Sequence, residues 1–186
     1  MHRGQILLLV SAIWAASEIA VAIAKRARSG SARKDRGSLY LLWGTIGLST
    51  YLGSVISSTV RSARIPFDTF WLGIALIIAG IIVRAIAIAT LWRYFTVNVA
   101  IAHDHELIDR GMYRFIRHPS YTGSLISFLG LGLAFRNWIS LALIAVATTA
   151  AFTYRVRVEE AALIEHFGDR YRDYMKRTRR FVPGVM

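Results

Sequence analysis

Long apolar runs separated by short polar or basic connections dominate the chain. A hydrocarbon core about 30 Å thick takes roughly 20 helical residues to cross, and five segments are candidates for such a crossing. They cover approximately residues 5–24, 39–60, 69–92, 121–135 and 138–154. The pattern therefore predicts an all-α, multi-pass integral membrane protein with about five transmembrane helices.

The fourth segment is short, and it carries Gly123, Gly130 and Gly132. Because small residues let two helices approach closely, we expect this segment to pack against the fifth as a tight hairpin that turns around Arg136 and Asn137. The first segment has the charged start and apolar middle of a signal peptide, but it lacks a convincing small-residue cleavage site and more spans follow. We therefore keep it as the first membrane helix.

Composition agrees with a single membrane domain over residues 1–186, because 55% of the residues are hydrophobic. The net charge of +12 is distributed between the apolar runs. This distribution favours contact with anionic membrane lipids and argues against nucleic acid as a partner. The absence of cysteine excludes disulfides and thiolate metal sites. Nothing in the sequence indicates an oligomeric state.

Lysine and arginine alternate along the connections. The stretch 25–36 holds six of them, 93–117 holds four and the tail after Tyr154 holds eight, whereas the intervening connections hold only Arg61 with Arg64, and Arg136. Because basic connections stay in the cytosol, we predict an N-terminus outside and a C-terminus in the cytosol. In a bacterium this would be the inner membrane.

Two ionisable residues, Glu18 and Arg84, fall inside predicted spans. In the predicted orientation they lie at a similar depth, roughly 10 Å from the cytosolic ends of their helices. An isolated charge at such a depth is costly. We therefore expect the two side chains to form an ion pair, with a structural role favoured over a role in substrate binding.

The last third of the chain carries a series of motifs: His105 to Tyr113, then Arg117-His118-Pro119-Ser120-Tyr121-Thr122-Gly123, then Arg155 before Glu159-Glu160, and finally 167–174 with Val182-Pro183. In this order and spacing the series resembles the isoprenylcysteine carboxyl methyltransferases and the wider group of phospholipid methyltransferase-like membrane enzymes. The resemblance covers about residues 95–183. It implies a cofactor-binding and catalytic part over 95–183, preceded by a three-helix membrane scaffold over 1–94.

Pro119 is suited to the first position of a helix, where its missing N–H costs nothing. Such a helix end favours an anion, and Arg117 and His118 lie beside it. They are placed to hold a carboxylate, either that of S-adenosylmethionine or that of the substrate. Alternatively, Arg117 anchors to lipid phosphate and His118 caps the helix.

Glu159 and Glu160 are neighbours on a predicted helix, so their side chains diverge by about 100°. One of them suits the ribose hydroxyls and the cationic part of S-adenosylmethionine, and the other is expected to be partly structural. The alternative is a solvated face, because Arg155 and Arg157 lie within one turn.

The resemblance implies specific roles for these residues. The catalytic residues would be Arg117, Arg155 and Glu159, and S-adenosylmethionine would be bound by His105, Leu107, Gly111, Tyr113, His118, Pro119, Tyr121, Gly123, Glu159 and Glu160. Tyr113 and Tyr121 also suit an interfacial aromatic belt, and Gly123 also suits close helix packing. No metal site is expected, because His103 and His105 would face apart on a helix.

The implied activity is S-adenosylmethionine-dependent methyl esterification of a carboxylate on an isoprenylcysteine-like or other lipophilic acceptor, at the cytosolic membrane face. A carboxylate is already ionised at neutral pH, so alignment and exclusion of water would suffice. Two alternatives stay open. The His-Pro-x-Tyr-x-Gly start is also similar to that of NADPH-dependent membrane sterol reductases, and a non-enzymatic membrane scaffold is possible.

Apolar residues recur at helical spacing after the glutamate pair, over residues 161–178. This pattern predicts an amphipathic cytosolic helix, interrupted near Phe167 and Gly168, that lies on the lipid headgroups. We expect it to help cover the cofactor. A simple membrane-surface anchor would give the same pattern.

Overall fold

The computed structural model describes residues 2–24, 32–33, 37–97, 100–101 and 106–182. The helices within these ranges are α1 (Arg3–Ala24), α2 (Ser38–Thr59), α3 (Phe70–Leu91), α4 (Pro119–Ala134), α5 (Trp138–Phe167) and α6 (Asp169–Arg177), with short 3₁₀ turns η1 (Arg61–Ala63), η2 (Trp92–Tyr94) and η3 (Gly111–Arg114). Two strands of two residues each, β1 (Ala32–Arg33) and β2 (Ala100–Ile101), pair antiparallel. The predicted all-α class is confirmed.

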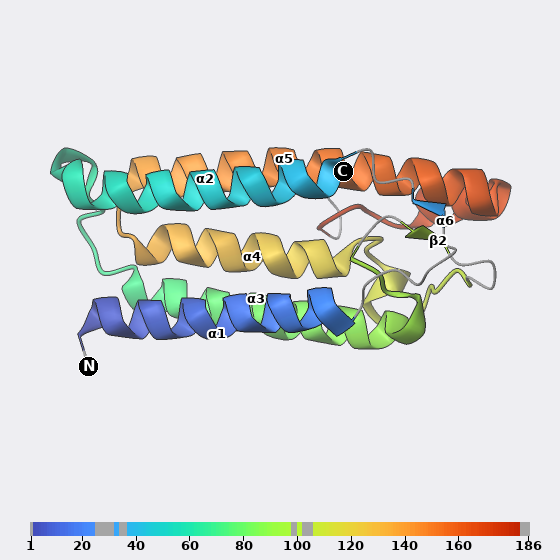
Figure 1. Ribbon diagram of the computed structural model, residues 1–186, viewed down its shortest axis with the longest axis horizontal. Coiled ribbons are helices and arrows are strands. Elements are labelled where there is room, and N and C mark those ends of the chain that lie inside the picture. Colours follow the sequence, from blue (N-terminus) through green and yellow to red (C-terminus); the bar gives the residue numbers. More distant parts are fainter. Residues whose placement is uncertain (1, 25–31, 34–36, 98–99, 102–105, 183–186) are drawn as a thin grey trace.

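The long helices form a layered bundle in which α4 is the central element (Figure 1). Helices α2 and α5 pack together on one side of α4, and α3 packs against its other side with α1 beside α3. Four helices, α1, α2, α3 and α5, are long and apolar enough to cross a membrane. Helix α4 has only 16 residues, or about 24 Å, so its crossing stays a prediction.

Helix α4 packs most closely against α3, and glycines make this approach possible. A Cβ atom on Gly73 would lie 2.6 Å from the carbonyl oxygen of Gly130, and one on Gly123 would lie 2.6 Å from that of Gly80. The prediction that Gly123 and Gly130 face α5 was therefore wrong. Only Gly132 faces α5, where its neighbour is Leu141.

The turn between α4 and α5 lies at one end of the bundle, centred on Arg136 and Asn137 as predicted. The Asn137 side chain caps α5 by accepting hydrogen bonds from the backbone N–H groups of Ile139 and Ser140, at 3.0 and 3.1 Å. Its amide nitrogen also donates to the carbonyl oxygen of Val60, at 2.8 Å. This single side chain thus ties the α4–α5 turn to the end of α2.

The longer connections meet at the opposite end, which we call the site end. The pairing of β1 with β2 joins the connection after α1 to the connection after α3. The segment 178–181 lies against the start of α4 at the same end, with Arg179 paired alongside Ile116. The basic connections therefore share one end of the bundle, while the side of the membrane that this end faces stays a prediction.

The tail contains the predicted interruption at Phe167 and Gly168. Helix α5 continues to Phe167, and Gly168 then adopts a φ of +57°, a value that favours glycine, before α6 begins. Tyr171 and Tyr174 of α6 are each 2% exposed. The inner face of α6 therefore packs on protein, and the contact of its outer face with lipid headgroups stays a prediction.

The predicted pair between Glu18 and Arg84 is confirmed. The Arg84 guanidinium donates to both carboxylate oxygens of Glu18, at 2.5 and 2.7 Å, in a bidentate arrangement. It also donates to the carbonyl oxygen of Ser120, at 3.3 Å. Since these residues belong to α1, α3 and α4, the pair links the outer helix α1 to the centre of the bundle.

Candidate active site

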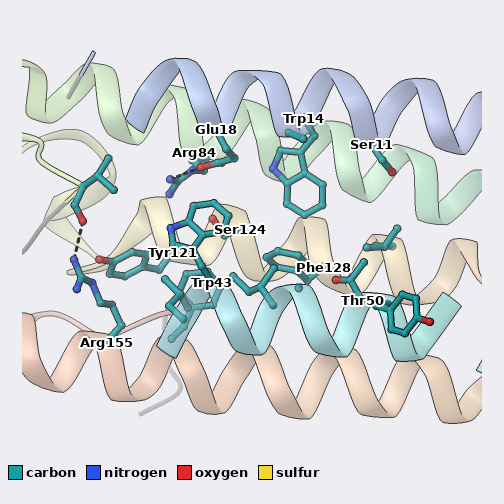
Figure 2. Close-up of a pocket in the computed structure, with 18 of the residues that line it drawn as sticks. Ser11, Trp14, Glu18, Trp43, Thr50, Arg84, Tyr121, Ser124, Phe128 and Arg155 are labelled. Atoms are coloured by element: carbon teal, nitrogen blue, oxygen red, sulfur yellow. Dashed lines mark hydrogen bonds and ion pairs between the residues drawn. The ribbon is translucent and has the colours of Figure 1, made fainter. Parts of the chain in front are cut away.

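Two adjoining cavities lie within the bundle and at its site end. The larger, which we call the bundle cavity, has a volume of about 680 Å³ and runs between the helices with mostly apolar walls (Figure 2). The smaller, which we call the rim cavity, has a volume of about 90 Å³ and lies at the site end among tyrosines, Arg117, His118 and Glu159. A surface groove of about 330 Å³ adjoins the rim cavity and shares Leu91, Tyr94 and the run 106–108 with it.

The bundle cavity and the rim cavity share part of their walls. The shared residues are Phe95, Thr96, Tyr121 and Arg155. Tyr121 comes from the first turn of α4 and Arg155 from α5, and Figure 2 shows both at the same end of the bundle cavity. The apolar bundle cavity and the polar rim cavity therefore adjoin each other at this junction.

Most of the residues predicted for the site lie around the rim cavity. Those that line it are Leu107, Tyr113, Arg117, His118, Tyr121, Arg155 and Glu159. Gly111, Pro119, Gly123 and Glu160 lie outside its wall, and His105 falls outside the described residues. The structure thus brings together the two halves of the motif series, 107–121 and 155–159.

Glu159 and Glu160 occupy different environments, as their angular separation on α5 requires. The Glu159 carboxylate accepts a hydrogen bond from the Tyr121 hydroxyl, at 2.7 Å, and lines the rim cavity. Glu160 is only 3% exposed and accepts from Arg117, at 2.9 Å, and from Arg180, at 3.0 Å. Glu159 therefore faces the cavity, whereas Glu160 pairs with the buried Arg117 and the half-buried Arg180.

Arg117 is held by protein groups on several sides. Besides its bond to Glu160, its guanidinium donates to the carbonyl oxygens of Met175 and Thr178, at 3.1 and 2.5 Å. These bonds fix the end of α6 and the following tail against the start of α4. The Nε and Nη1 donors of Arg117 are thus used by the protein itself, which favours a structural role for this side chain.

The first turn of α4 is also covered. The backbone N–H groups of Arg117 and His118 donate to the carbonyl oxygens of Arg179 and Arg180, at 2.7 and 3.2 Å, and the Thr122 hydroxyl donates to the carbonyl of Phe181, at 2.7 Å. The tail therefore covers the approach to this helix end, and binding of an anion there stays a prediction.

Arg155 is 1% exposed and is fixed at the junction of the two cavities. It donates to the Ser38 hydroxyl, at 2.5 Å, and to the carbonyl oxygen of Val97, at 2.7 Å. The two acceptors belong to the start of α2 and to the connection after α3. The guanidinium is thus rigidly placed, and its positive charge lies where the two cavities meet.

Three tyrosines close the site end. Burial raises the pKa of Tyr113, Tyr171 and Tyr174 well above the ordinary value of 10.0. They therefore stay protonated, and the Tyr174 hydroxyl can donate to the carbonyl oxygen of Tyr113, at 2.6 Å. The wall that they form is fixed and uncharged.

The remaining predicted residues shape the backbone around the cavity. Gly111 has a φ of +60° beside Thr90, which explains a glycine at the start of η3. Pro119 is the first residue of α4, as predicted. Gly123 faces α3, so its position favours helix packing over contact with a cofactor. The described residues contain no group of three or more His, Asp or Glu side chains that could hold a metal ion.

Sequence reasoning missed several residues of the cavity walls. Phe95 and Thr96 lie at the junction, but they follow α3 in a connection without a helical pattern that would show their direction. Leu163, Phe167 and Tyr171 also line the rim cavity. Their spacing had indicated an apolar helix face, and only the fold of α6 against Tyr113 and Arg117 shows that this face covers the cavity.

Comparison with known proteins supports this interpretation of the geometry. The model of the isoprenylcysteine carboxyl methyltransferase (ICMT) family matches residues 72–165, which is half of the chain. The chain belongs to this family. The match runs from α3 through Glu159 and Glu160, so it contains both halves of the motif series.

Individual similar proteins carry names from the same family. The chain is 34% identical over 121 residues to the protein-S-isoprenylcysteine O-methyltransferase of Dictyostelium discoideum, covering 64% of this chain and 51% of that one. It is 38% identical over 115 residues to protein-S-isoprenylcysteine O-methyltransferase B of Arabidopsis thaliana, covering 61% and 58%. The chain thus spans between half and two thirds of the length of these relatives.

A solved structure has the same fold. The eukaryotic intramembrane Ras methyltransferase ICMT superposes with a TM-score of 0.66 and 25% sequence identity, covering 77% of this chain and 52% of that one. A multi-pass membrane fold for this chain is therefore confirmed. Helices α1 and α2, which form one side of the bundle cavity, precede the residues that the ICMT family model matches.

Proposed function

We propose that this protein transfers a methyl group from S-adenosylmethionine to the carboxylate of a lipophilic acceptor at one face of the membrane. The observation that carries the proposal is the shared wall of the two cavities. The rim cavity has polar groups and opens beside a surface groove, whereas the bundle cavity is apolar and lies between membrane helices. A water-soluble donor and a lipid acceptor would each have a compartment, and they would meet at Tyr121 and Arg155.

The rim cavity and the adjoining groove suit a sulfonium nucleotide. The Glu159 carboxylate faces the cavity and suits a cationic group, and tyrosine rings line the walls. Together the rim cavity and the adjoining groove have a volume within the usual range of small-molecule binding sites. Bound S-adenosylmethionine would supply an electrophilic methyl group, whose transfer forms an O–CH₃ bond and leaves a neutral thioether.

The chain's own residues would align the acceptor and exclude water. Arg155 would orient the acceptor carboxylate through its fixed positive charge. Tyr121 would hold Glu159 toward the donor side through their 2.7 Å hydrogen bond. The apolar wall of the bundle cavity would remove water from the carboxylate, which raises its nucleophilicity. No general base is required, because a carboxylate is ionised at neutral pH.

The names of the relatives support the choice of acceptor. The Dictyostelium and Arabidopsis proteins are named for methyl transfer to protein-S-isoprenylcysteine, so a lipid-linked carboxylate is the acceptor class that we propose. The protein's orientation, with the site end in the cytosol, belongs to the same proposal. It rests on the basic connections that gather at that end.

The test is methyl transfer by the purified protein in lipid nanodiscs. The protein is incubated with methyl-labelled S-adenosylmethionine and N-acetyl-S-farnesylcysteine, and the product is treated with mild base. We expect label that base releases as methanol, and a weaker signal from Glu159→Gln when S-adenosylmethionine is below saturation. Label that resists base would refute carboxyl methylation, and binding of NADPH in place of S-adenosylmethionine would favour a reductase.

A further inference from the structure

The bundle cavity is long and runs parallel to the helices. On α4 its wall extends from Tyr121 to Phe135, and on α1 it extends from Glu18 to Gly4. Each stretch covers 14 residue steps, which corresponds to about 21 Å at the rise of an α-helix. Figure 2 shows Tyr121 and Phe128 in succession along the α4 wall. The cavity therefore extends about 21 Å from the junction toward the opposite end of the bundle.

The surroundings of the cavity are charged at both of its ends. The junction carries the fixed positive charge of Arg155, which is 1% exposed. At the opposite end, Arg3 and Arg136 directly adjoin wall residues in the sequence, and both pair with Asp68, at 2.7 and 3.7 Å. We call these three residues the charged cluster. An apolar tail that extended past the cavity would have to displace water from these charges, which is unfavourable.

The distance between the two ends fixes the length of tail that suits the cavity. An extended carbon chain advances roughly 1.3 Å per bond, because a C–C single bond is about 1.5 Å long and the chain zigzags. Hexadecanoic acid has about 15 bonds, or roughly 20 Å, between its carboxyl carbon and its terminal methyl group, and S-farnesylcysteine has the same number along its longest path. With its carboxylate beside Arg155, either molecule would fill the cavity and end before the charged cluster.

A glycine keeps this path open on α2. Gly47 lines the cavity, and a Cβ atom added there would have nothing within 4 Å. It lies eight positions after Leu39, the neighbour of the Ser38 hydroxyl that binds Arg155, so its depth is about 12 Å from the junction. The α2 wall continues to Ser54, seven positions further along the same helix face. A tail that fills the cavity must pass Gly47, where a large side chain would obstruct it.

We propose that the bundle cavity measures the length of a linear lipid carboxylate. It accepts a tail that ends about 15 bonds from the carboxyl carbon, the charged cluster excludes longer tails, and the missing side chain of Gly47 leaves the path open. For prenylated acceptors, a tail of three isoprene units fits, and a tail of four is too long by roughly 5 Å.

The inference rests on the proposed function for the position of the carboxylate beside Arg155. The walls on α1 and α2 precede residues 72–165, which the family model matches. The length preference is accordingly a property of this chain's own N-terminal helices.

The experiment measures the binding of labelled dodecanoic, hexadecanoic and eicosanoic acids to the protein in nanodiscs, without a methyl donor. Binding to protein-free nanodiscs is subtracted, and each Kd is expressed relative to the concentration of the acid in the bilayer, so that partition into lipid does not affect the comparison. We expect the wild type to bind eicosanoic acid several-fold more weakly than hexadecanoic acid, because the longer tail reaches the charged cluster.

Two variants on α2 obstruct the cavity at different depths. Gly47→Trp places a ring about 12 Å from the junction, so it should raise the Kd of both dodecanoic and hexadecanoic acid by about tenfold. Ser54→Trp places the same ring near the far end, leaning toward the junction. It should weaken hexadecanoic acid by a similar factor and leave dodecanoic acid, which is only about 14 Å long, with its wild-type Kd.

Gly44→Trp is the matched control on the same helix. A Cβ atom at Gly44 also has nothing within 4 Å, but Gly44 does not line the bundle cavity. This variant should keep the wild-type Kd for all three acids. The melting temperature of each variant shows whether it is folded.

The outcomes separate this inference from the proposed function. Equal binding of eicosanoic and hexadecanoic acid by the wild type would refute the length limit. An equal loss of both shorter acids in Ser54→Trp, or no loss in Gly47→Trp, would refute the path of the tail. Methyl transfer to a lipid carboxylate would still be possible in these cases, because no donor is present in the experiment. Conversely, a graded response to the two variants would stand even if no methyl transfer were observed.

Discussion

The two neighbouring glutamates should respond in opposite ways to the same substitution. Glu160→Gln keeps the size of the side chain but removes a charge that is 3% exposed and bonded to Arg117 and Arg180. Arg117 is itself only 8% exposed, so the substitution leaves a buried cation without its counter-charge. Removing one partner of such a pair costs about 3 kcal/mol or more.

That loss corresponds to a decrease of roughly 6–12 °C in the melting temperature of a chain of this size. Glu159→Gln should behave differently, because the glutamine oxygen can still accept from the Tyr121 hydroxyl. We expect its melting temperature to stay close to that of the wild type. Its Kd for S-adenosylmethionine should rise by about tenfold, since a charge-assisted contact to the cationic donor is lost.

The assay measures both quantities on the same samples. Thermal unfolding in detergent reports stability. Titrations with S-adenosylmethionine and with S-adenosylhomocysteine report affinity, and only S-adenosylmethionine carries a positively charged sulfur. The affinity loss in Glu159→Gln should be larger for S-adenosylmethionine. If Glu160→Gln left the melting temperature unchanged and weakened the cofactor instead, the assignment of the two glutamates would be refuted.

Three further predictions concern stability, and thermal unfolding checks each of them. Glu18→Gln and Arg84→Gln should each destabilise the protein, and the double variant should be more stable than the worse single variant if the two charges pair. Gly73→Leu should destabilise by several kcal/mol, because its Cβ would meet the α4 backbone at 2.6 Å, whereas Gly44→Leu, with nothing within 4 Å, should not. Burial raises the pKa of Tyr174 above its unfolded value of 10.0. The stability that the protonated Tyr174 contributes should therefore be complete below about pH 10 and fall as the pH rises further. In Tyr174→Phe the melting temperature should fall less steeply over the same pH range.

The fold class followed from the sequence because it depends on local properties. The length of an apolar run and its period decide whether a segment can cross a membrane as a helix, and the helix positions were predicted to within a few residues, apart from the α5 end. Helix α4 does contact α5 as predicted, but its closest packing is against α3, and the assignment of Gly123 and Gly130 to α5 was wrong. Its glycines indicate close packing, but nothing local shows that Gly123 and Gly130 face α3 while Gly132 faces α5.

The candidate site also has features that the sequence predicted and features that only the structure shows. The return of the chain through α4 and α5 required the motif at 117–123 and the glutamate pair to meet, and the contacts of Tyr121 with Glu159 and of Arg117 with Glu160 are in agreement. The exposed helix end that was expected at Pro119 is instead covered by the tail. That contact joins residues about sixty positions apart, so no local pattern could indicate it.

By itself, the sequence determined that this chain is a multi-pass membrane protein with its chemistry-bearing residues at one end of the bundle, because hydrophobic length and residue type are properties of short segments. Only the tertiary structure decided which glutamate faces the cavity, that Arg117 is used by the protein itself, and that Gly47 lines the bundle cavity. These outcomes depend on which helix faces meet and on which polar groups remain to be satisfied once the helices have packed.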